Sequence, residues 1–133
     1  MNPLFALVLA SAATTVRDCS TGTSLFKFGT ASLTPDPVVP GQDASLSLSC
    51  TIPEGVVVTG GKATYGFSFN GIPFTPTEED LCSQVECPLV SGPYENTTTT
   101  QFPAGVKGKI VSTIKWYDLS SVLLYCLELT VKI

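Results

Sequence analysis

The segment ASLSLSCTI, residues 44–52, alternates apolar side chains with hydroxyl-bearing ones. A period of two is typical of a β-strand that buries one face and exposes the other to water. The face predicted to be buried carries Ala44, Leu46, Leu48, Cys50 and Ile52. Because Cys50 belongs to this set, we expect its thiol to point inward.

Other segments of the chain also have the pattern of strands. Residues 62–70, 109–116 and 123–133 alternate clearly, and weaker strand patterns cover residues 25–33, 56–58 and 94–102. No segment of helical length has apolar residues at a period of 3.6. The prolines within residues 35–40 and 73–76 are expected in connections or at sheet edges, because proline cannot donate a hydrogen bond to a neighbouring strand. Seven short strands, separated by turn signals about every ten residues, predict an all-β sandwich of two sheets.

Composition and charge exclude several functional classes. The chain has 133 residues, 44% of them hydrophobic and 14% charged, with a formal net charge of -4 at pH 7. This length predicts one domain, and the negative charge lacks the electrostatic attraction that non-specific nucleic-acid binding needs. The absence of histidine excludes a Ser-His-Asp triad, a Cys-His dyad and His-ligated zinc. We predict no catalytic residues, no cofactor, no metal site and no nucleic-acid partner.

The amino terminus indicates secretion. Residues 1–13, MNPLFALVLASAA, combine an apolar run with small residues suited to cleavage, which predicts a signal peptide there and a mature domain over residues 14–133. An oxidising compartment makes the five cysteines candidates for disulfides, and their odd number leaves at least one without a partner in the chain. The sequon Asn96-Thr97-Thr98 makes Asn96 a predicted N-glycosylation site.

The order of cysteine and tryptophan excludes an ordinary immunoglobulin domain. In that domain the tryptophan follows the first cysteine of the disulfide on a nearby strand. Here the single tryptophan, Trp116, lies ten residues before the last cysteine, Cys126. We therefore expect a sandwich of another kind.

Four landmarks follow one another along the chain. They are Cys19, SLTPDPVVPG at residues 32–41, DLCSQVECPLVSG at residues 80–92, and LLYCLELTVKI at residues 123–133. Together they resemble the ML-domain lipid-recognition family, most nearly its phosphatidylinositol/phosphatidylglycerol transfer proteins and more distantly its Niemann-Pick type C sterol carriers. The most specific part is the element from Asp80 to Pro88 in combination with a cysteine in the last strand.

The resemblance implies both a fold and a function. The fold would be an immunoglobulin-like β-sandwich that holds a phospholipid or sterol in a cavity between its two sheets and catalyses no reaction. The implied disulfides are Cys82–Cys87 and Cys19–Cys126, which leaves Cys50 as a free thiol. Sterol carriers of the family have a further disulfide in an early hairpin, and this sequence lacks that pair. We expect a monomer that contacts membranes transiently, either secreted or in the endolysosomal or vacuolar lumen.

The predicted cavity lining consists of large residues on the inward faces of the predicted strands. They are Leu46, Leu48, Ile52, Tyr65, Phe67, Phe69, Ile110, Trp116, Leu123, Tyr125, Leu127 and Leu129. Ordinary packing of a filled core would require the same residues. A secreted interaction or effector module without lipid is therefore the alternative function.

The polar features allow two interpretations each. Lys107, Lys109 and Lys115 are separated by even numbers of residues, so they would lie on one face of a strand and could contact an anionic headgroup. A solvated face is the simpler interpretation. The acidic residues 78–80 predict a solvated loop rather than a calcium site or the acid/base pair of a hydrolase, because no second acidic cluster accompanies them. Cys50 has no cation beside it in sequence, so an inert buried thiol is favoured over a reactive one.

Overall fold

The computed structural model describes residues 14–133 of the chain, so the predicted signal peptide lies outside the described residues. The described part contains eight strands and one short helix. In chain order these are β1 (Thr14–Asp18), β2 (Lys27–Thr34), β3 (Asp43–Val58), β4 (Gly61–Phe69), β5 (Ile72–Asp80), α2 (Leu81–Gln84), β6 (Leu89–Gln101), β7 (Lys109–Asp118) and β8 (Leu123–Lys132). Among these residues no helix has the length and apolar character needed to cross a membrane.

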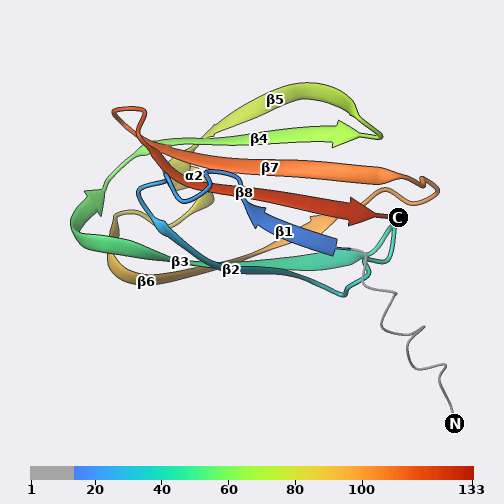
Figure 1. Ribbon diagram of the computed structural model, residues 1–133, viewed down its shortest axis with the longest axis horizontal. Coiled ribbons are helices and arrows are strands. Elements are labelled where there is room, and N and C mark those ends of the chain that lie inside the picture. The colour runs from blue at the N-terminus through green and yellow to red at the C-terminus, as the bar shows by residue number, and fades with distance from the viewer. Residues whose placement is uncertain (1–13) are drawn as a thin grey trace, which may run out of the picture.

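The strands form two antiparallel sheets that face each other (Figure 1). One sheet has five strands in the order β1-β8-β7-β4-β5, and the other has three in the order β2-β3-β6. The predicted all-β, two-sheet sandwich is confirmed. The two sheets differ in width, so part of the five-stranded sheet extends beyond the three-stranded one.

Strand β3 shows how the sequence pattern produces the core. Ala44, Leu46, Leu48, Cys50 and Ile52 are all buried, and most of the hydroxyl residues between them are exposed. The register with β6 shifts between Ile52 and Val57, where Gly55 adopts a φ of +82° that favours glycine. Beyond this bulge β3 continues to Val58, so residues 56–58 are the end of β3 rather than a separate strand.

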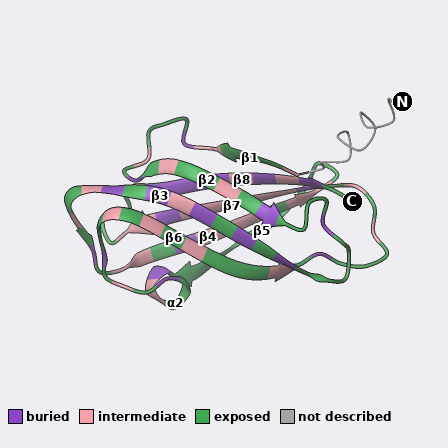
Figure 2. Cartoon of the chain, turned by 90° about the horizontal axis from the view of Figure 1, so that it is seen from below, coloured by how far each residue is buried: buried purple, intermediate pink, exposed green. Residues whose placement is uncertain are grey.

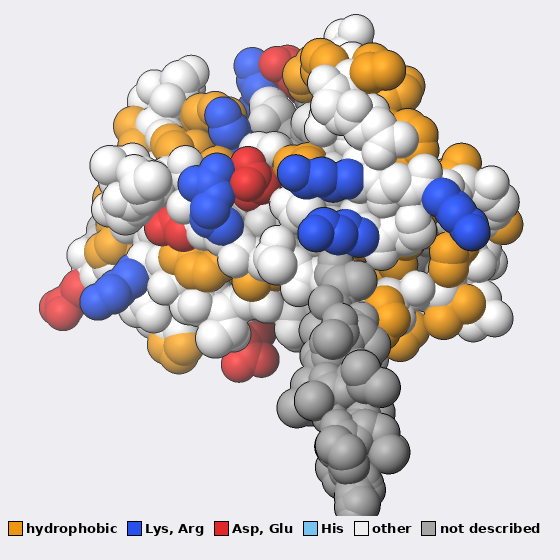
Figure 3. All heavy atoms as spheres, turned by 45° about the vertical axis from the view of Figure 1, so that its right-hand side comes forward, with side chains coloured by type: hydrophobic (Ala, Val, Ile, Leu, Met, Phe, Trp, Pro, Cys, Tyr) orange, Lys and Arg blue, Asp and Glu red, His pale blue; other side chains and the backbone are white. Residues whose placement is uncertain are grey.

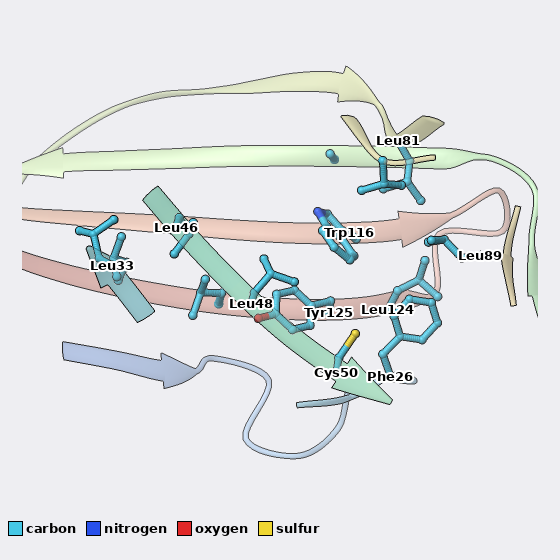
Figure 4. Packing of buried hydrophobic residues seen from close by; sticks show 14 of the residues in the cluster. Phe26, Leu33, Leu46, Leu48, Cys50, Leu81, Leu89, Trp116, Leu124 and Tyr125 are labelled. Atoms are coloured by element: carbon cyan, nitrogen blue, oxygen red, sulfur yellow. The ribbon is translucent and has the colours of Figure 1, made fainter. Parts of the chain in front are cut away.

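The core lies between the sheets, where buried positions alternate with exposed ones along the strands (Figure 2). Most of its largest fully buried side chains come from β3, β7 and β8, and the others are Phe26 before β2, Leu81 in α2 and Leu89 in β6. Figure 4 shows these side chains meeting in the space between β3 and the strands β7 and β8.

Two disulfides fasten the ends of the sandwich. Cys19, directly after β1, is bonded to Cys126 in β8, and Cys82 is bonded to Cys87 across α2. These are the pairs that the family resemblance implies. Cys50 is free and buried.

Two strands differ from the sequence-based expectation. Strand β1 lacks a strong apolar alternation, and β5 contains two prolines and is exposed along its whole length. Both are edge strands, where one side of the backbone needs no partner. The acidic residues 78–80, expected in a loop, therefore lie in β5, although they are exposed as predicted.

Candidate binding pocket between the sheets

A small pocket lies between the two sheets next to α2. Its floor is apolar and consists of Leu46 and Leu48 from β3 with Ile114 and Trp116 from β7. Its volume is about 50 Å³. Ligand pockets usually measure about 300–1,000 Å³, so a lipid tail can occupy this space only if the two sheets move apart.

The mouth of the pocket lies between β4 and β6, which belong to different sheets and are not paired. Its rim is formed by polar groups of Tyr65 on β4, Gln84 on α2, and Asn96 and Thr98 on β6. Asn96 and Thr98 pair with Leu48 and Leu46 in the register of β3 and β6, which brings them to the inward side. An apolar floor with a polar rim suits a ligand that has an apolar part inside and a polar part at the surface.

A hydrogen bond closes one side of the mouth. The Tyr65 hydroxyl donates to Gln84 Oε1 at 2.9 Å. The Cys82–Cys87 disulfide and the fully buried Leu81 hold α2 in place. Burial raises the pKa of Tyr65, and the nearby charge of Glu79 adds to the increase. The phenol therefore keeps its proton at neutral pH and remains able to donate.

Aromatic rings from both sheets cross the interior beside the pocket. Trp116 lies between Tyr94, at a centroid distance of 6.2 Å, and Tyr125, at 5.0 Å. Tyr125 in turn stacks on Phe28 of β2 at 5.7 Å. Ring pairs at these distances add to the stabilisation that burial provides. They pack together the interior beside Trp116, which borders the pocket.

Cys50 lies in the same interior and has no reactive character. Burial raises the pKa of its thiol to about 11. Because the thiolate is the nucleophilic form, a thiol with this pKa is unreactive near neutral pH. Its position among apolar neighbours on β3 fits a packing role.

Eight of the twelve residues predicted to line a cavity are buried in the core. They are Leu46, Leu48, Ile52, Ile110, Trp116, Tyr125, Leu127 and Leu129. Tyr65, Phe69 and Leu123 are half-buried. The residues from this prediction that border the pocket are Leu46, Leu48, Tyr65 and Trp116. A lipid-lining role for the other buried residues stays a prediction.

Phe67 requires a correction. It belongs to the same alternation as Tyr65 and Phe69, but its side chain is 38% exposed. Its ring lies 5.2 Å from that of Phe74, on the exposed edge strand β5. The narrower three-stranded sheet does not cover this part of β4. Phe67 therefore lies on the inward face of its strand but is not buried.

Leu123 differs from the strict alternation for another reason. The register between β7 and β8 shifts so that Trp116 pairs with Tyr125 and Tyr117 pairs with Leu123. The extra residue, Leu124, is fully buried. A bulge of this kind changes which residues share a face, and a period of two cannot predict it.

Several pocket residues were not predicted from the sequence. They are Gln84, Val85, Asn96, Thr98 and Ile114. Ile114 could have been found, because it alternates with Ile110 and Trp116. Gln84 and Val85 lie at the end of the short helix α2, whose position depends on tertiary contacts. The polar side chains of β6 do not match a search for an apolar lining.

Asn96 has a different environment from that of a typical glycosylation site. It is half-buried at the mouth of the pocket, and its Nδ2 donates a hydrogen bond to the Tyr94 hydroxyl at 3.2 Å. A glycan attached to this nitrogen would occupy the mouth of the pocket. Glycosylation of Asn96 stays a prediction, and it would compete with entry of a ligand by this route.

The acidic residues do not assemble a metal site in the described part of the chain. Among residues 14–133 no group of three or more His, Cys, Asp or Glu side chains could hold a metal ion. The carboxylates of residues 78–80 are all exposed. Their environment is that of solvated surface charges.

The fold and the pocket together define a two-sheet β-sandwich with an apolar interior site and a polar mouth. Residues 13–133 match the model of the ML domain. The chain belongs to the ML domain family.

Comparisons with individual proteins agree with this assignment. A phosphatidylglycerol/phosphatidylinositol transfer protein of Cryptococcus neoformans is 25% identical over 122 residues, which cover 86% of this chain and 67% of the relative. A Niemann-Pick type C2 protein from the Japanese carpenter ant superimposes with a TM-score of 0.66 at 18% identity, covering 90% of this chain and 98% of the ant protein. Chicken MD-1, crystallised in complex with lipid IVa, gives a TM-score of 0.62 at 16% identity over 92% of this chain and 90% of MD-1.

Proposed function

We propose that this protein binds one lipid molecule between its sheets and carries it between membranes. The observation that carries the proposal is the pocket with its floor of Leu46, Leu48 and Trp116 and its mouth between two unpaired strands. Membership of the ML domain family and a transfer protein among the relatives support it. The ligand is a phospholipid of the phosphatidylinositol or phosphatidylglycerol type, or a sterol.

Lipid entry requires the mouth to widen. The free energy for this is available from burial of the tail, since a few hundred Å² of apolar surface contribute several kcal/mol at about 25 cal/mol per Å². Strands β4 and β6 share no ladder that would have to break, so they can separate while each sheet stays intact. The sheets then act as two rigid walls around the tail.

The end of the β4–β5 hairpin supplies a surface for membrane contact. Ile72 is 66% exposed and Phe74 is 55% exposed, and both lie close in sequence to the turn at Asn70 and Gly71. We call this surface the hairpin tip: Phe67, Ile72 and Phe74. Exposed apolar side chains of this size insert favourably into the boundary between headgroups and acyl chains.

Basic side chains lie next to the hairpin tip. Asn70 Oδ1 accepts a hydrogen bond from the backbone N–H of Lys109 at 2.8 Å, and Lys109 pairs with Lys132 at the same end of the sheet. Figure 3 shows a face that carries several Lys and Arg side chains, with Asp, Glu and apolar side chains among them. Each lysine near an anionic membrane surface contributes about 1 kcal/mol. The proposed target is therefore an anionic membrane.

A direct route connects the hairpin tip with the pocket. Phe67 at the tip lies on the same side of β4 as Tyr65, which borders the mouth. A lipid tail leaving the membrane at the tip can follow this inward face of β4 to the pocket without crossing water. The exposure of Phe67, unexpected for a core residue, is consistent with such a role.

We further propose that residues 1–13 are a signal peptide and that the ML domain of residues 14–133 works outside the cytosol, in the secreted fluid or in an endolysosomal or vacuolar lumen. Two disulfides suit an oxidising compartment. The protein would act as a monomer there.

The alternative is a secreted interaction module with a filled core. The pocket volume of about 50 Å³ favours it as long as the sheets stay together. This alternative predicts that the protein binds no lipid from intact vesicles, whatever the lipid concentration.

Quenching of tryptophan fluorescence separates the two functions. Trp116 is the single tryptophan of the chain and lies on the pocket floor. Phosphatidylglycerol, phosphatidylinositol or cholesterol with bromine on the tail would quench it on entering. We expect saturation at one lipid per protein. Absence of quenching with all three lipids would overturn the proposal and favour the filled core.

A relocated tryptophan provides the control. The double variant Trp116→Phe, Leu119→Trp moves the fluorophore to a position that is 76% exposed, at the end of β7 away from the hairpin tip. We expect little quenching of this variant. Equal quenching of both proteins would indicate contact with the vesicle surface rather than entry into the pocket.

A further inference from the structure

The hydroxyl group of Tyr125 is buried and has no hydrogen-bond partner in the described part of the chain. Tyr125 lies on β8 and is 0% exposed. The other buried side-chain oxygen without a partner among residues 14–133 is Thr14 Oγ1, at the first described residue. Buried polar groups nearly always have a partner, so the Tyr125 hydroxyl needs an explanation.

The surrounding rings fix where this hydroxyl can be. The ring of Tyr125 is stacked on Phe28 with an interplanar angle of 10° and also contacts Trp116. It cannot swing out to water without breaking both contacts. Burial raises the pKa of Tyr125, and Cys50 and Asp18 add to the increase. The hydroxyl therefore keeps its proton and is available as a donor.

The position of Tyr125 connects it with the pocket. It pairs with Trp116 in the register of β7 and β8, and Trp116 lies on the pocket floor. In Figure 4 the Tyr125 ring lies between Leu48 and Cys50, with its oxygen at the Leu48 side. Leu48 also lines the pocket. When the sheets part along these residues, the hydroxyl faces the space that opens.

The strand order gives the depth of this hydroxyl. Strand β8 is two strands away from β4, which borders the mouth. At a strand spacing of about 4.8 Å, Tyr125 lies about 10 Å from β4 and the mouth. If a saturated hydrocarbon segment of the bound lipid lies at that depth, it offers no hydrogen-bond acceptor. The Tyr125 hydroxyl would then stay without a partner.

We propose that Tyr125 is a specificity-determining residue whose hydroxyl donates a hydrogen bond to an oxygen atom that the bound lipid carries into the interior. The acceptor is an ester carbonyl of a glycerolipid or the hydroxyl oxygen of a sterol. The inference rests on the proposed lipid-binding function and adds a selection rule to it. Lipids with an oxygen at this depth are preferred over lipids of the same shape without one.

Matched lipid pairs test this rule. One pair is dioleoyl phosphatidylglycerol and its diether analogue, which lacks both carbonyls, and the other is cholesterol and cholestane, which lacks the hydroxyl. Dissociation constants follow from the Trp116 fluorescence on titration. In at least one pair we expect the protein to bind the oxygen-bearing lipid about fivefold to tenfold more tightly, the range for one buried hydrogen bond.

The variant Tyr125→Phe should abolish this preference. It removes one oxygen atom, keeps the ring contacts, and should melt no lower than the unmodified protein because it removes a buried donor without a partner. Tyr117→Phe is the matched control, since Tyr117 lies in the neighbouring strand β7 on the opposite face of the sheet. This control should keep the preference.

The outcomes separate this inference from the proposed function. If the protein binds the lipids but shows no preference within either pair, or if Tyr125→Phe keeps the preference, the assignment of Tyr125 is overturned while lipid binding stands. An internal water that satisfies the hydroxyl would give this result. If none of the four lipids binds, the proposed function fails and the inference falls with it.

Discussion

The Tyr65 hydroxyl donates a hydrogen bond to Gln84 Oε1 at 2.9 Å, and the bond joins β4 to the helix α2 at the mouth of the pocket. Both side chains border the pocket, so the bond holds the Tyr65 ring at its entrance. Across the mouth, Asn96 donates to Tyr94 within its own strand β6. Strands β4 and β6 can therefore separate without breaking a strand pairing, but the Tyr65 ring can turn away from the entrance only when its bond to Gln84 breaks.

Removing the Gln84 side chain should accelerate lipid uptake. In Gln84→Ala the Tyr65 ring loses its anchor, and a net hydrogen-bond contribution of about 0.5–1.5 kcal/mol corresponds to an increase in rate of up to about tenfold. Stopped-flow quenching of Trp116 by brominated phosphatidylglycerol measures this rate. Gln42→Ala, an exposed substitution in the loop before β3, is the control. An unchanged rate in Gln84→Ala would mean that the ring does not limit entry.

The two disulfides should differ in their contribution to stability. The Cys19–Cys126 bond closes a loop with a sequence separation of 107, and Cys82–Cys87 closes one of 5. In the chain-entropy model these contribute about 5 and about 2 kcal/mol. We expect Cys19→Ala, Cys126→Ala to lower the free energy of unfolding by more than Cys82→Ala, Cys87→Ala does, as measured by urea denaturation. Equal losses would show that native packing around the bonds, rather than loop length, determines their effect.

The core strands were predictable because their environment imposes a strict period of two. The segment 44–52 packs on a sheet through one face, so its apolar residues had to alternate. The same holds for residues 62–70 and 109–116, which became β4 and β7. The cysteine landmarks indicated a resemblance to the ML domain family, and this resemblance implied the two disulfides that the structure contains.

The features that the sequence did not predict depend on relations between strands. That Phe67 is exposed follows from the width of the opposite sheet, which no local pattern contains. Leu123 departs from the predicted face because of a register shift between β7 and β8. The polar rim of the pocket includes Asn96 from a weakly patterned strand and Gln84 from the short helix α2. The sequence therefore predicted the floor of the site better than its mouth.

Membrane binding should depend on the hairpin tip. The variant Phe74→Ser removes an exposed apolar side chain, and burial of such a side chain contributes about 1.5–3 kcal/mol. We expect at least tenfold weaker sedimentation with vesicles that contain phosphatidylglycerol, at about 1.4 kcal/mol per factor of ten. Val57→Ser, a similarly exposed change at the opposite end of the sandwich, should have little effect. Equal losses in both variants would argue against a specific contact surface.

The lysines beside the hairpin tip should make that binding depend on salt. Lys107→Gln, Lys109→Gln removes two positive charges, each contributing about 1 kcal/mol near an anionic surface. We expect weaker binding to anionic vesicles at low ionic strength and a smaller difference at 1 M salt, where screening is strong. Lys27→Gln, on the other sheet, is the control. Binding that is insensitive to both substitution and salt would leave apolar insertion as the driving contribution.

Asp18 should stabilise the fold down to mildly acidic pH. Burial acts to raise the pKa of Asp18, but hydrogen bonds from Ser20 and Gly22 and the charge of Arg17 outweigh it and lower the pKa below the ordinary value of 3.8. Ser20 Oγ donates to Asp18 Oδ1 at 2.6 Å, and the Gly22 N–H donates to Oδ2 at 3.1 Å. Because this pKa is lower in the folded state, ionised Asp18 contributes its full stabilisation at a pH above the pKa of the unfolded state. This stabilisation is lost as the pH falls through the pKa of the folded state.

The lowered pKa of Asp18 sets the pH range in which this residue stabilises the fold. The stabilisation by Asp18 should be fully present at pH 5, as in an acidic lumen, and should decline only below about pH 4. Urea denaturation at pH 7, 5 and 3 measures this, with Asp18→Asn expected to be destabilised at pH 7 and 5 and to approach the unmodified protein at pH 3. Glu54→Gln, an exposed substitution on β3, is the matched control for the loss of a surface carboxylate. A constant difference between Asp18→Asn and the unmodified protein at all three pH values would show that the hydrogen bonds of this turn stabilise the fold independently of the charge.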